Sequence, residues 1–275
     1  MAKVAIVTGA SRGLGRGIAL TLAKEGGYKV YATARNKSAL ENLAKEVSGV
    51  SGEGVIIPSV LDQSDDAQVE KFVSAVVAEQ KEIHVLVNSA YGGLIAMTPH
   101  FGKPFWERPV SVYDEALNIG ARSAYVMSKF VAPIMVDNKS GLIIQTSSTG
   151  GFHYVFEVAY GVGHAAIDRL TTDMAIELEP FNVKSVTLSP VGGCVTEIVL
   201  LSDRLKGSVS VLYCNRFLLV WYWNIGCPIT FLISLAAFIL EAFISPVVSP
   251  FSKNSYFSAN SAVKTNFPFI SFSSS

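Results

Sequence analysis

The 275-residue chain has few of the residue types that mark several common protein classes. Its three cysteines, Cys194, Cys214 and Cys227, form an odd and unpatterned set, which argues against a disulfide scaffold and fits a reducing compartment. Its four histidines share no metal-ligand spacing, so we expect no bound metal. Lys and Arg together equal Asp and Glu at 22 each, and this balance gives no reason to expect a nucleic-acid partner.

A secretory leader is also missing before the first apolar run, which starts directly after Met1–Lys3. We therefore expect a cytoplasmic protein. The segment Phe217–Leu240 contains no charged residue at all. As a helix it would extend about 36 Å at 1.5 Å per residue, more than the ~30 Å hydrocarbon core of a bilayer. Anchoring to an intracellular membrane such as the endoplasmic reticulum is therefore one interpretation of this segment.

The stretch Val4–Gly17 carries the first positive evidence for a function. Val4–Val7 is a fully apolar run, as expected for a strand buried on both faces of a parallel sheet. Gly9, Gly13 and Gly15 then allow a tight turn whose backbone can approach a phosphate. Helical spacing of apolar residues follows from Leu14, so strand, turn and helix start together predict a pyrophosphate site. A glycine turn without a ligand is the alternative.

Five further apolar runs alternate with segments of helical periodicity. This alternation predicts an α/β fold with a doubly wound parallel sheet. We expect Tyr91–Pro109 to be a loop whose aromatic residues Phe101, Phe105 and Trp106 act as apolar anchors, and Ser111–Val136 to be one long helix. The runs are 28–35, 54–60, 84–90, 141–148 and 183–189, and the helical segments are 14–24, 37–47, 65–80, 111–136 and 160–179.

The pattern T-G-x-x-x-G-x-G near the N-terminus resembles the short-chain dehydrogenase/reductase family. F-W-E-x-P at Phe105–Pro109 and Y-G-V-G at Tyr160–Gly163 are most similar to the member 1 branch of that family. The resemblance covers residues 3–205. It implies a Rossmann-type oxidoreductase domain that reduces a carbonyl, or oxidises a secondary alcohol, by hydride transfer with a nicotinamide cofactor. It also implies a small-molecule substrate and makes a homodimer plausible.

The predicted cofactor is NADP(H), with NAD(H) as the less favoured choice. Arg35 lies twenty positions after Gly15, where an acidic residue would bind the 2′-hydroxyl of NAD and an arginine accommodates the 2′-phosphate of NADP. Alternatively, Arg35 and Arg12 are simply solvated. Asp62 matches a family position that contacts adenine, although it could equally be a helix cap. The predicted cofactor-binding residues are Gly9, Ser11, Arg12, Gly13, Leu14, Gly15, Arg35, Asp62, Asn88, Tyr160, His164 and Thr196.

The resemblance also implies the catalytic groups. Tyr160 matches the proton donor and Asn118 the helix asparagine that orders a relay water. Ser148 fits the end of the strand pattern, whereas Ser147 has the commoner separation from the tyrosine, and we take Ser148. The family has a lysine four residues after the tyrosine, but this chain has His164. The predicted catalytic set is therefore Asn118, Ser148, Tyr160 and His164, although Tyr160 could also be an ordinary core tyrosine.

His164 puts turnover in doubt. A lysine ammonium lowers the pKa of a neighbouring tyrosine, and a histidine with a pKa of about 6.5 is mostly neutral at pH 7. We expect weakened chemistry with retained cofactor binding, so a cofactor-binding protein with little turnover is the alternative function. The segment N-S-A-Y at Asn88–Tyr91 is a second, milder departure from the family's N-N-A-G.

The character of the sequence changes near residue 205, so we predict two parts. Residues 1–205 form the oxidoreductase domain and residues 206–275 an atypical tail. After Lys206 the family's seventh strand and covering helices are not recognisable, so the tail appears in their place. It is a membrane anchor, a segment that is not a native structural element (such as translated non-coding sequence after a splice error), or a replacement for the missing core elements.

Overall fold

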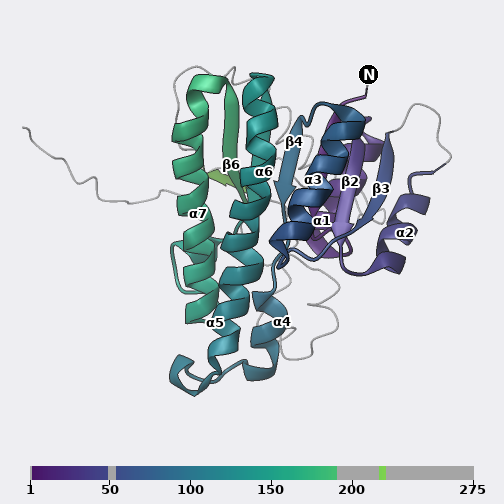
Figure 1. Ribbon diagram of the computed structural model, residues 1–275. Helices are drawn as coiled ribbons and strands as arrows, with labels where there is room; N and C mark the ends of the chain where they lie inside the picture. Colours follow the sequence, from purple (N-terminus) through teal and green to yellow (C-terminus); the bar gives the residue numbers. More distant parts are fainter. Residues whose placement is uncertain (1, 49–53, 191–216, 221–275) are drawn as a thin grey trace, which may run out of the picture.

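The computed structural model describes residues 2–48, 54–190 and 217–220, and these form one sheet flanked by helices (Figure 1). The strand order is β3-β2-β1-β4-β5-β6-β7, and the first six strands are parallel. The doubly wound parallel sheet is therefore confirmed. The parallel strands are β1 (Val4–Thr8), β2 (Lys29–Ala34), β3 (Val55–Val60), β4 (Val85–Asn88), β5 (Gly141–Thr146) and β6 (Val183–Pro190).

Strand β1 lies at the point where the strand order reverses. All five of its residues are buried, and its central Ile6 pairs with Tyr31 of β2 on one side and Leu86 of β4 on the other. From β2 the chain continues outward to β3 and then crosses to the far side of β1 to form β4. In open α/β sheets such a switch point leaves a crevice at the carboxyl ends of the strands, where ligands bind.

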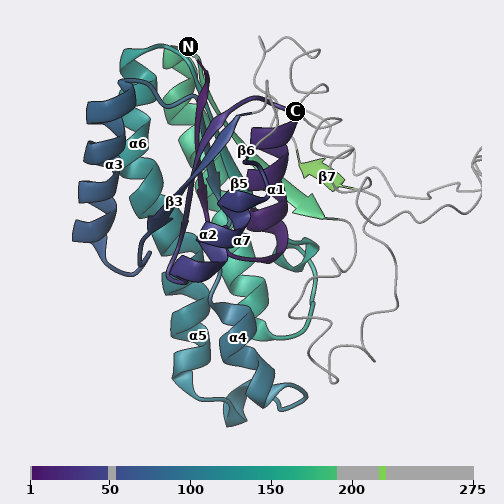
Figure 2. The same cartoon turned by 90° about the vertical axis from the view of Figure 1, so that its right-hand side faces the viewer.

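Helices cover both faces of the sheet, as the view in Figure 2 shows. On one face α1 (Gly13–Lys24) and α2 (Lys37–Lys45) pack through buried residues such as Leu22 and Leu40. On the other face α3 (Asp66–Gln80), α6 (Ser123–Asp137) and α7 (Val158–Leu178) contribute to a second core that includes Val73 and Met127. The uninterrupted apolar strands follow from this burial on both faces.

The segment predicted as a loop with apolar anchors after β4 contains short helical elements. It forms α4 (Gly93–Met97) and the 3₁₀ turns η1 (Thr98–His100) and η2 (Phe105–Glu107), and we call residues 93–109 the cap. In Figure 1, α4 and the start of α5 lie beyond the carboxyl edge of the sheet. The expected aromatic anchors are only partly correct: Phe101 packs on Phe156, but Phe105 and Trp106 are 61% and 73% exposed.

The long helix predicted for residues 111–136 is interrupted. It consists of α5 (Val110–Ala116), a π-turn η3 (Leu117–Arg122) and α6. Ile119 within this turn has φ −101° and ψ 50°, outside the helical region, and its carbonyl accepts the backbone N–H of Gly92 at 2.8 Å. The interruption therefore joins the helix to the start of the cap. Two short 3₁₀ turns, η4 (Thr149–Gly151) and η5 (Glu179–Phe181), flank α7.

A seventh strand, which was not recognisable in the sequence, follows over four residues. β7 (Phe217–Val220) pairs antiparallel with β6, with Phe217 opposite Pro190. These residues open the segment 217–240 that suggested a membrane span, and they are a strand rather than a helix. The rest of that segment, Thr196 and the boundary between residues 205 and 206 lie outside the described residues. Within the described ranges, no helix combines the length and apolar character needed to cross a bilayer.

Candidate active site

The glycine turn after β1 is held so closely that two of its positions admit no side chain. Gly9 has φ +65°, and a Cβ there would lie 2.7 Å from the carbonyl oxygen of Ser89. A Cβ on Gly15 would lie 2.6 Å from the Gly9 oxygen. Thr8 Oγ1 accepts the backbone N–H groups of Ser89 and Ala90 at 3.0 and 3.1 Å, which locks the turn onto the end of β4. The glycines are thus required by the packing itself.

The N-terminus of α1 differs from those of the next two helices. Asn36 and Asp65 cap α2 and α3 with their side chains, accepting backbone N–H groups at 3.0 Å. Arg12, the residue before α1, makes no such side-chain cap, and the first turn of α1 holds no acidic residue. The positive end of this helix dipole therefore faces an exposed arginine instead of a carboxylate. Together with the glycine turn, which also contains Ser11 and Leu14, these residues fit the pyrophosphate of a dinucleotide.

Arg35 and Asp62 follow the adjacent strands β2 and β3. Arg35 is exposed directly after β2. Asp62 accepts the backbone N–H and the hydroxyl of Ser64 at 2.9 and 2.8 Å. These two hydrogen bonds lower the pKa of Asp62, and the charge of Arg35 lowers it further. Asp62 therefore stabilises a turn beside Arg35, while the helix cap that sequence suggested for it is supplied by Asp65.

Asn88, predicted to bind the cofactor, has its side chain in the core. It is 6% exposed, and Nδ2 donates to Ser128 Oγ of α6 at 3.0 Å. Ser128 also accepts from Gln145 of β5 at 3.3 Å. Asn88 thus holds the end of β4 against α6, directly before Ser89 and Ala90, whose backbone packs on Gly9. Its side chain therefore supports, from within the core, the Gly9–Gly15 turn, which we call the glycine cradle.

Tyr160 and His164 lie on successive turns of α7. His164 Nδ1 is 2.9 Å from the carbonyl oxygen of Tyr160. Because a carbonyl oxygen only accepts, Nδ1 carries the proton and Nε2 is left as an acceptor. Burial lowers the pKa of His164 to about 4, partly offset by this hydrogen bond. A lowered pKa agrees with the expectation of a neutral imidazole at pH 7, where the family has a charged lysine.

A third ring, Tyr91, completes the cluster. The His164 ring lies 4.2 Å from the Tyr160 ring and 4.8 Å from the Tyr91 ring, measured between centroids. The Tyr91 hydroxyl is buried and points towards α4, where a Cβ on Gly93 would come within 2.5 Å of it. Burial raises the pKa of Tyr91. The two departures from the family pattern, at positions 91 and 164, are therefore in contact, which sequence reasoning missed.

The two candidate serines have different surroundings. Ser148 is partly exposed, and its Oγ accepts the backbone N–H of Gly150 at 3.2 Å. The same turn packs on the proton-donor candidate, because a Cβ on Gly150 would lie 2.6 Å from Tyr160 Cε1. Ser147 is buried beside the half-buried Asp168 of α7, whose pKa is raised by burial and lowered in part by the Ser147 hydroxyl. Ser148 is thus the more accessible hydroxyl on the turn that touches Tyr160.

Asn118 lies on the π-turn η3, and its side chain is exposed. Its carbonyl accepts the N–H of Ser123 five residues later, which is the hydrogen bond that widens the turn. Such π-bulges inside helices are frequent at functional sites. The periodicity of the sequence contained no signal for this interruption, because the flanking apolar residues keep helical spacing on both sides.

Comparison with known proteins agrees with this geometry. Residues 3–202 match the family model described as short chain dehydrogenase. The chain belongs to the short-chain dehydrogenase family. It is 44% identical over 198 residues to mouse dehydrogenase/reductase SDR family member 1, covering 72% of this chain and 62% of that protein. It is 42% identical over 208 residues to the human member 1, covering 75% of this chain and 65% of that protein. The chain thus spans less than two thirds of these curated relatives.

A solved short-chain dehydrogenase is also similar. A metagenomic short-chain oxidoreductase in complex with NADP superposes with a TM-score of 0.61 at 28% identity, covering 70% of this chain and 83% of that one. The similarity to the short-chain dehydrogenase family, and in particular to member 1, is therefore confirmed. Among the residues that the structure describes, no group of three or more metal-ligating side chains gathers at one place.

Proposed function

We propose that the chain is an NADP(H)-dependent oxidoreductase that interconverts a small-molecule carbonyl compound and its alcohol. The observation that carries the proposal is the adjacency of the glycine cradle and the Tyr160 cluster, both of which contact residues 89–91 after β4. Family membership supports oxidoreductase chemistry, and an NADP-bound relative supports the cofactor.

The residues of this chain take complementary roles in the proposed reaction. The bound nicotinamide supplies or accepts the hydride. The Gly9–Gly15 turn and Arg12 would hold the pyrophosphate, and Arg35 would pair with the 2′-phosphate that distinguishes NADP. These residues lie at the carboxyl edge of the sheet, so the substrate would be bound at the same edge.

The proton moves at Tyr160. Its hydroxyl donates to the oxygen that becomes the alkoxide, and the Ser148 hydroxyl donates a second hydrogen bond to the same oxygen. Asn118 stands on the turn from which the proton is resupplied through water. His164 holds the Tyr160 backbone through Nδ1 and presents Nε2 only as an acceptor, so it supplies neither a positive charge nor a second donor.

A second function has its own support. His164 is buried and neutral where the family has an ammonium, so the phenol of Tyr160 lacks the charge that favours its ionisation. A protein that binds NADP(H) with little turnover would retain the cradle and lose only this charge.

Measurements of NADPH binding and turnover on the full chain distinguish the two proposed functions. We expect saturable quenching or enhancement of NADPH fluorescence, with weaker binding of NADH. Arg35→Leu should weaken NADPH binding about tenfold and leave NADH binding unchanged, because only the 2′-phosphate contact is lost. Oxidation of NADPH with an aldehyde probe, abolished in Tyr160→Phe, supports the reductase, whereas binding without oxidation supports the second function. Absence of binding by the folded chain would contradict both.

A further inference from the structure

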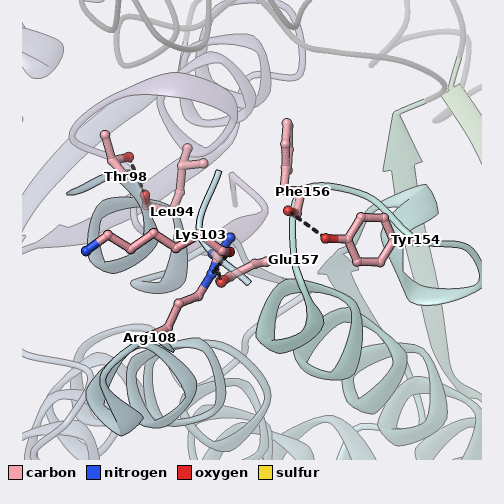
Figure 3. A network of polar contacts seen from close by, with 7 residues as sticks. All are labelled: Leu94, Thr98, Lys103, Arg108, Tyr154, Phe156 and Glu157. Atoms are coloured by element: carbon pink, nitrogen blue, oxygen red, sulfur yellow. Dashed lines mark hydrogen bonds and ion pairs between the residues drawn. The ribbon is translucent and has the colours of Figure 1, made fainter. Parts of the chain in front are cut away.

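A buried ion pair joins the cap to the residue that precedes α7. Arg108 and Glu157 form a hydrogen-bonded salt bridge, and their side chains are only 6% and 3% exposed. Figure 3 shows Arg108 reaching between Glu157 and the backbone of Lys103. Arg108 Nε donates to the carbonyl oxygen of Lys103 at 2.8 Å, so the guanidinium also closes the turn from which it comes. A buried pair with this bonding holds both segments in one arrangement.

Glu157 stands directly before Val158, the first residue of α7, and three residues before Tyr160. In this position a side chain commonly caps the helix, but the Glu157 carboxylate makes no such bond and turns to Arg108 instead. Its backbone carbonyl accepts the N–H of Gly161 at 3.2 Å. A displacement of Glu157 is therefore transmitted to the turn that carries Tyr160.

Phe156, two residues before α7 begins, has a strained backbone. Phe156 has φ +61°, a conformation that a bulky side chain adopts only when its surroundings enforce it. Its ring packs on Tyr160 with centroids 5.1 Å apart and on Phe101 of the cap at 6.0 Å. Tyr154 Oη donates to the Phe156 carbonyl at 3.2 Å, as Figure 3 shows. Continuous contacts thus connect the cap, the strained turn around Phe156 and Tyr160, the proton-donor candidate.

We propose that Arg108 and Glu157 are positioning residues, a clamp that fixes the Phe156 ring against Tyr160 and so sets the place of the proton donor. The proposal rests on the proposed role of Tyr160. Arg108 supplies the attachment to the cap, Glu157 supplies the attachment to α7, and Phe156 transmits the constraint to the phenol ring. The clamp acts on the proton-transfer geometry and leaves the glycine cradle, on the other side of β4, unchanged.

Loss of either partner should release the cap and the strained turn together. In Arg108→Met the carboxylate of Glu157 stays buried without its cation, and in Glu157→Gln the charge is removed while a hydrogen-bonding amide remains. Amide hydrogen exchange of the full chain without cofactor measures the release directly. We expect faster exchange in residues 98–109 and 154–163 of both variants, with unchanged exchange in β1 and α1.

A kinetic measurement then separates positioning from simple structural support. With 4-nitrobenzaldehyde as the carbonyl probe, we expect kcat to fall about tenfold in Arg108→Met because a small displacement of a reacting group is costly. The Kd for NADPH should stay within about twofold, since the cradle is not touched. Arg108→Lys, which keeps the charge, should restore part of kcat.

Matched controls make the result decisive. Arg169→Met removes an exposed ion pair with Asp173 on the same helix and should change neither exchange nor kcat. If Arg108→Met does not fold, Glu157→Asp shortens the clamp by one methylene and serves in its place. Unchanged exchange in residues 154–163 overturns the clamp, and altered exchange with unchanged kcat overturns its positioning role. If the wild-type chain has no turnover, the proposed reductase fails, while the exchange measurement still decides the clamp.

Discussion

The carboxyl ends of β1 and β4 separate two groups of residues, the proposed nucleotide side around Gly9–Gly15 and the proposed catalytic side around Tyr160, and the two differ in how they keep the family's pattern. The nucleotide side has each expected glycine, and the structure requires Gly9 and Gly15 through close backbone approaches. The catalytic side has a tyrosine at position 91 and a histidine at position 164, and these two rings touch. A cradle made of backbone is constrained by sterics, whereas a proton-transfer site is constrained by side-chain chemistry. The fold therefore survives changes on the second side that it would not tolerate on the first.

The comparison predicts that a single methyl group on the nucleotide side has the largest effect. In Gly9→Ala the new Cβ would lie 2.7–2.8 Å from the backbone of Ser89 and Ala90, at a φ of +65°. We expect the binding free energy of NADPH to fall by about 3 kcal/mol, which is roughly 100-fold weaker binding, because the turn must shift away from the end of β4. Fluorescence titration of NADPH measures the loss.

Gly27 provides the matched control. Its φ of +64° is nearly the same, but a Cβ there meets nothing within 4 Å. Gly27→Ala should therefore cost only about 1 kcal/mol of stability from its positive φ and leave NADPH binding unchanged. Equal effects of the two substitutions on binding would show that backbone conformation, and not the close approach to β4, makes Gly9 necessary.

The next largest effect is expected on the proposed catalytic side, where His164 should make the stability of the protein depend on pH. His164 has a pKa of about 4 in the folded protein, against about 6.5 when unfolded. Between these values the unfolded chain binds more protons, so stability rises with pH, is complete above 6.5 and is lost as pH falls towards 4. The difference of 2.5 pKa units corresponds to about 3 kcal/mol at most.

Urea unfolding of the wild type and of His164→Gln at pH 7 and pH 4 isolates this contribution. The carboxylates of the protein titrate in both chains, so the difference between the two curves belongs to His164. We expect the wild type to lose about 3 kcal/mol more than the variant over this range. Equal losses of stability in the two chains would mean that the folded protein takes up a proton at His164 as readily as the unfolded chain does.

The same contrast explains what the sequence could predict. The sheet and the glycine cradle follow from local patterns: apolar runs such as Val4–Val7, and glycines at fixed spacing before a helix. The neutral state of His164 also followed from its ordinary pKa. These features depend on neighbours in the chain, and the structure confirms the fold that they predicted.

What could not be predicted depends on residues far apart in the chain. Tyr91 and His164 are separated by 73 positions, and Arg108 and Glu157 by 49. The π-turn at Ile119 keeps apolar spacing on both sides, so periodicity indicated one helix. Phe217–Val220 opened a segment for which a membrane-spanning helix was one of three interpretations, because an edge strand of four residues leaves no alternation to detect. Contacts of this kind are set by tertiary packing and have no local pattern.

The smallest expected effect is also the most direct test of the difference between the two sides. His164→Lys places an ammonium on a flexible stem beside Tyr160, which favours ionisation of the phenol, and we expect turnover of NADPH with an aldehyde to rise about tenfold. The gain is limited because the lysine stem must fit where the His164 ring now packs at a tilt against Tyr91. Adding Tyr91→Ala to this variant should raise turnover further by opening that space, whereas His164→Gln, which is neutral, should bring no gain. An unchanged rate in both lysine variants would mean that charge at position 164 does not limit the reaction.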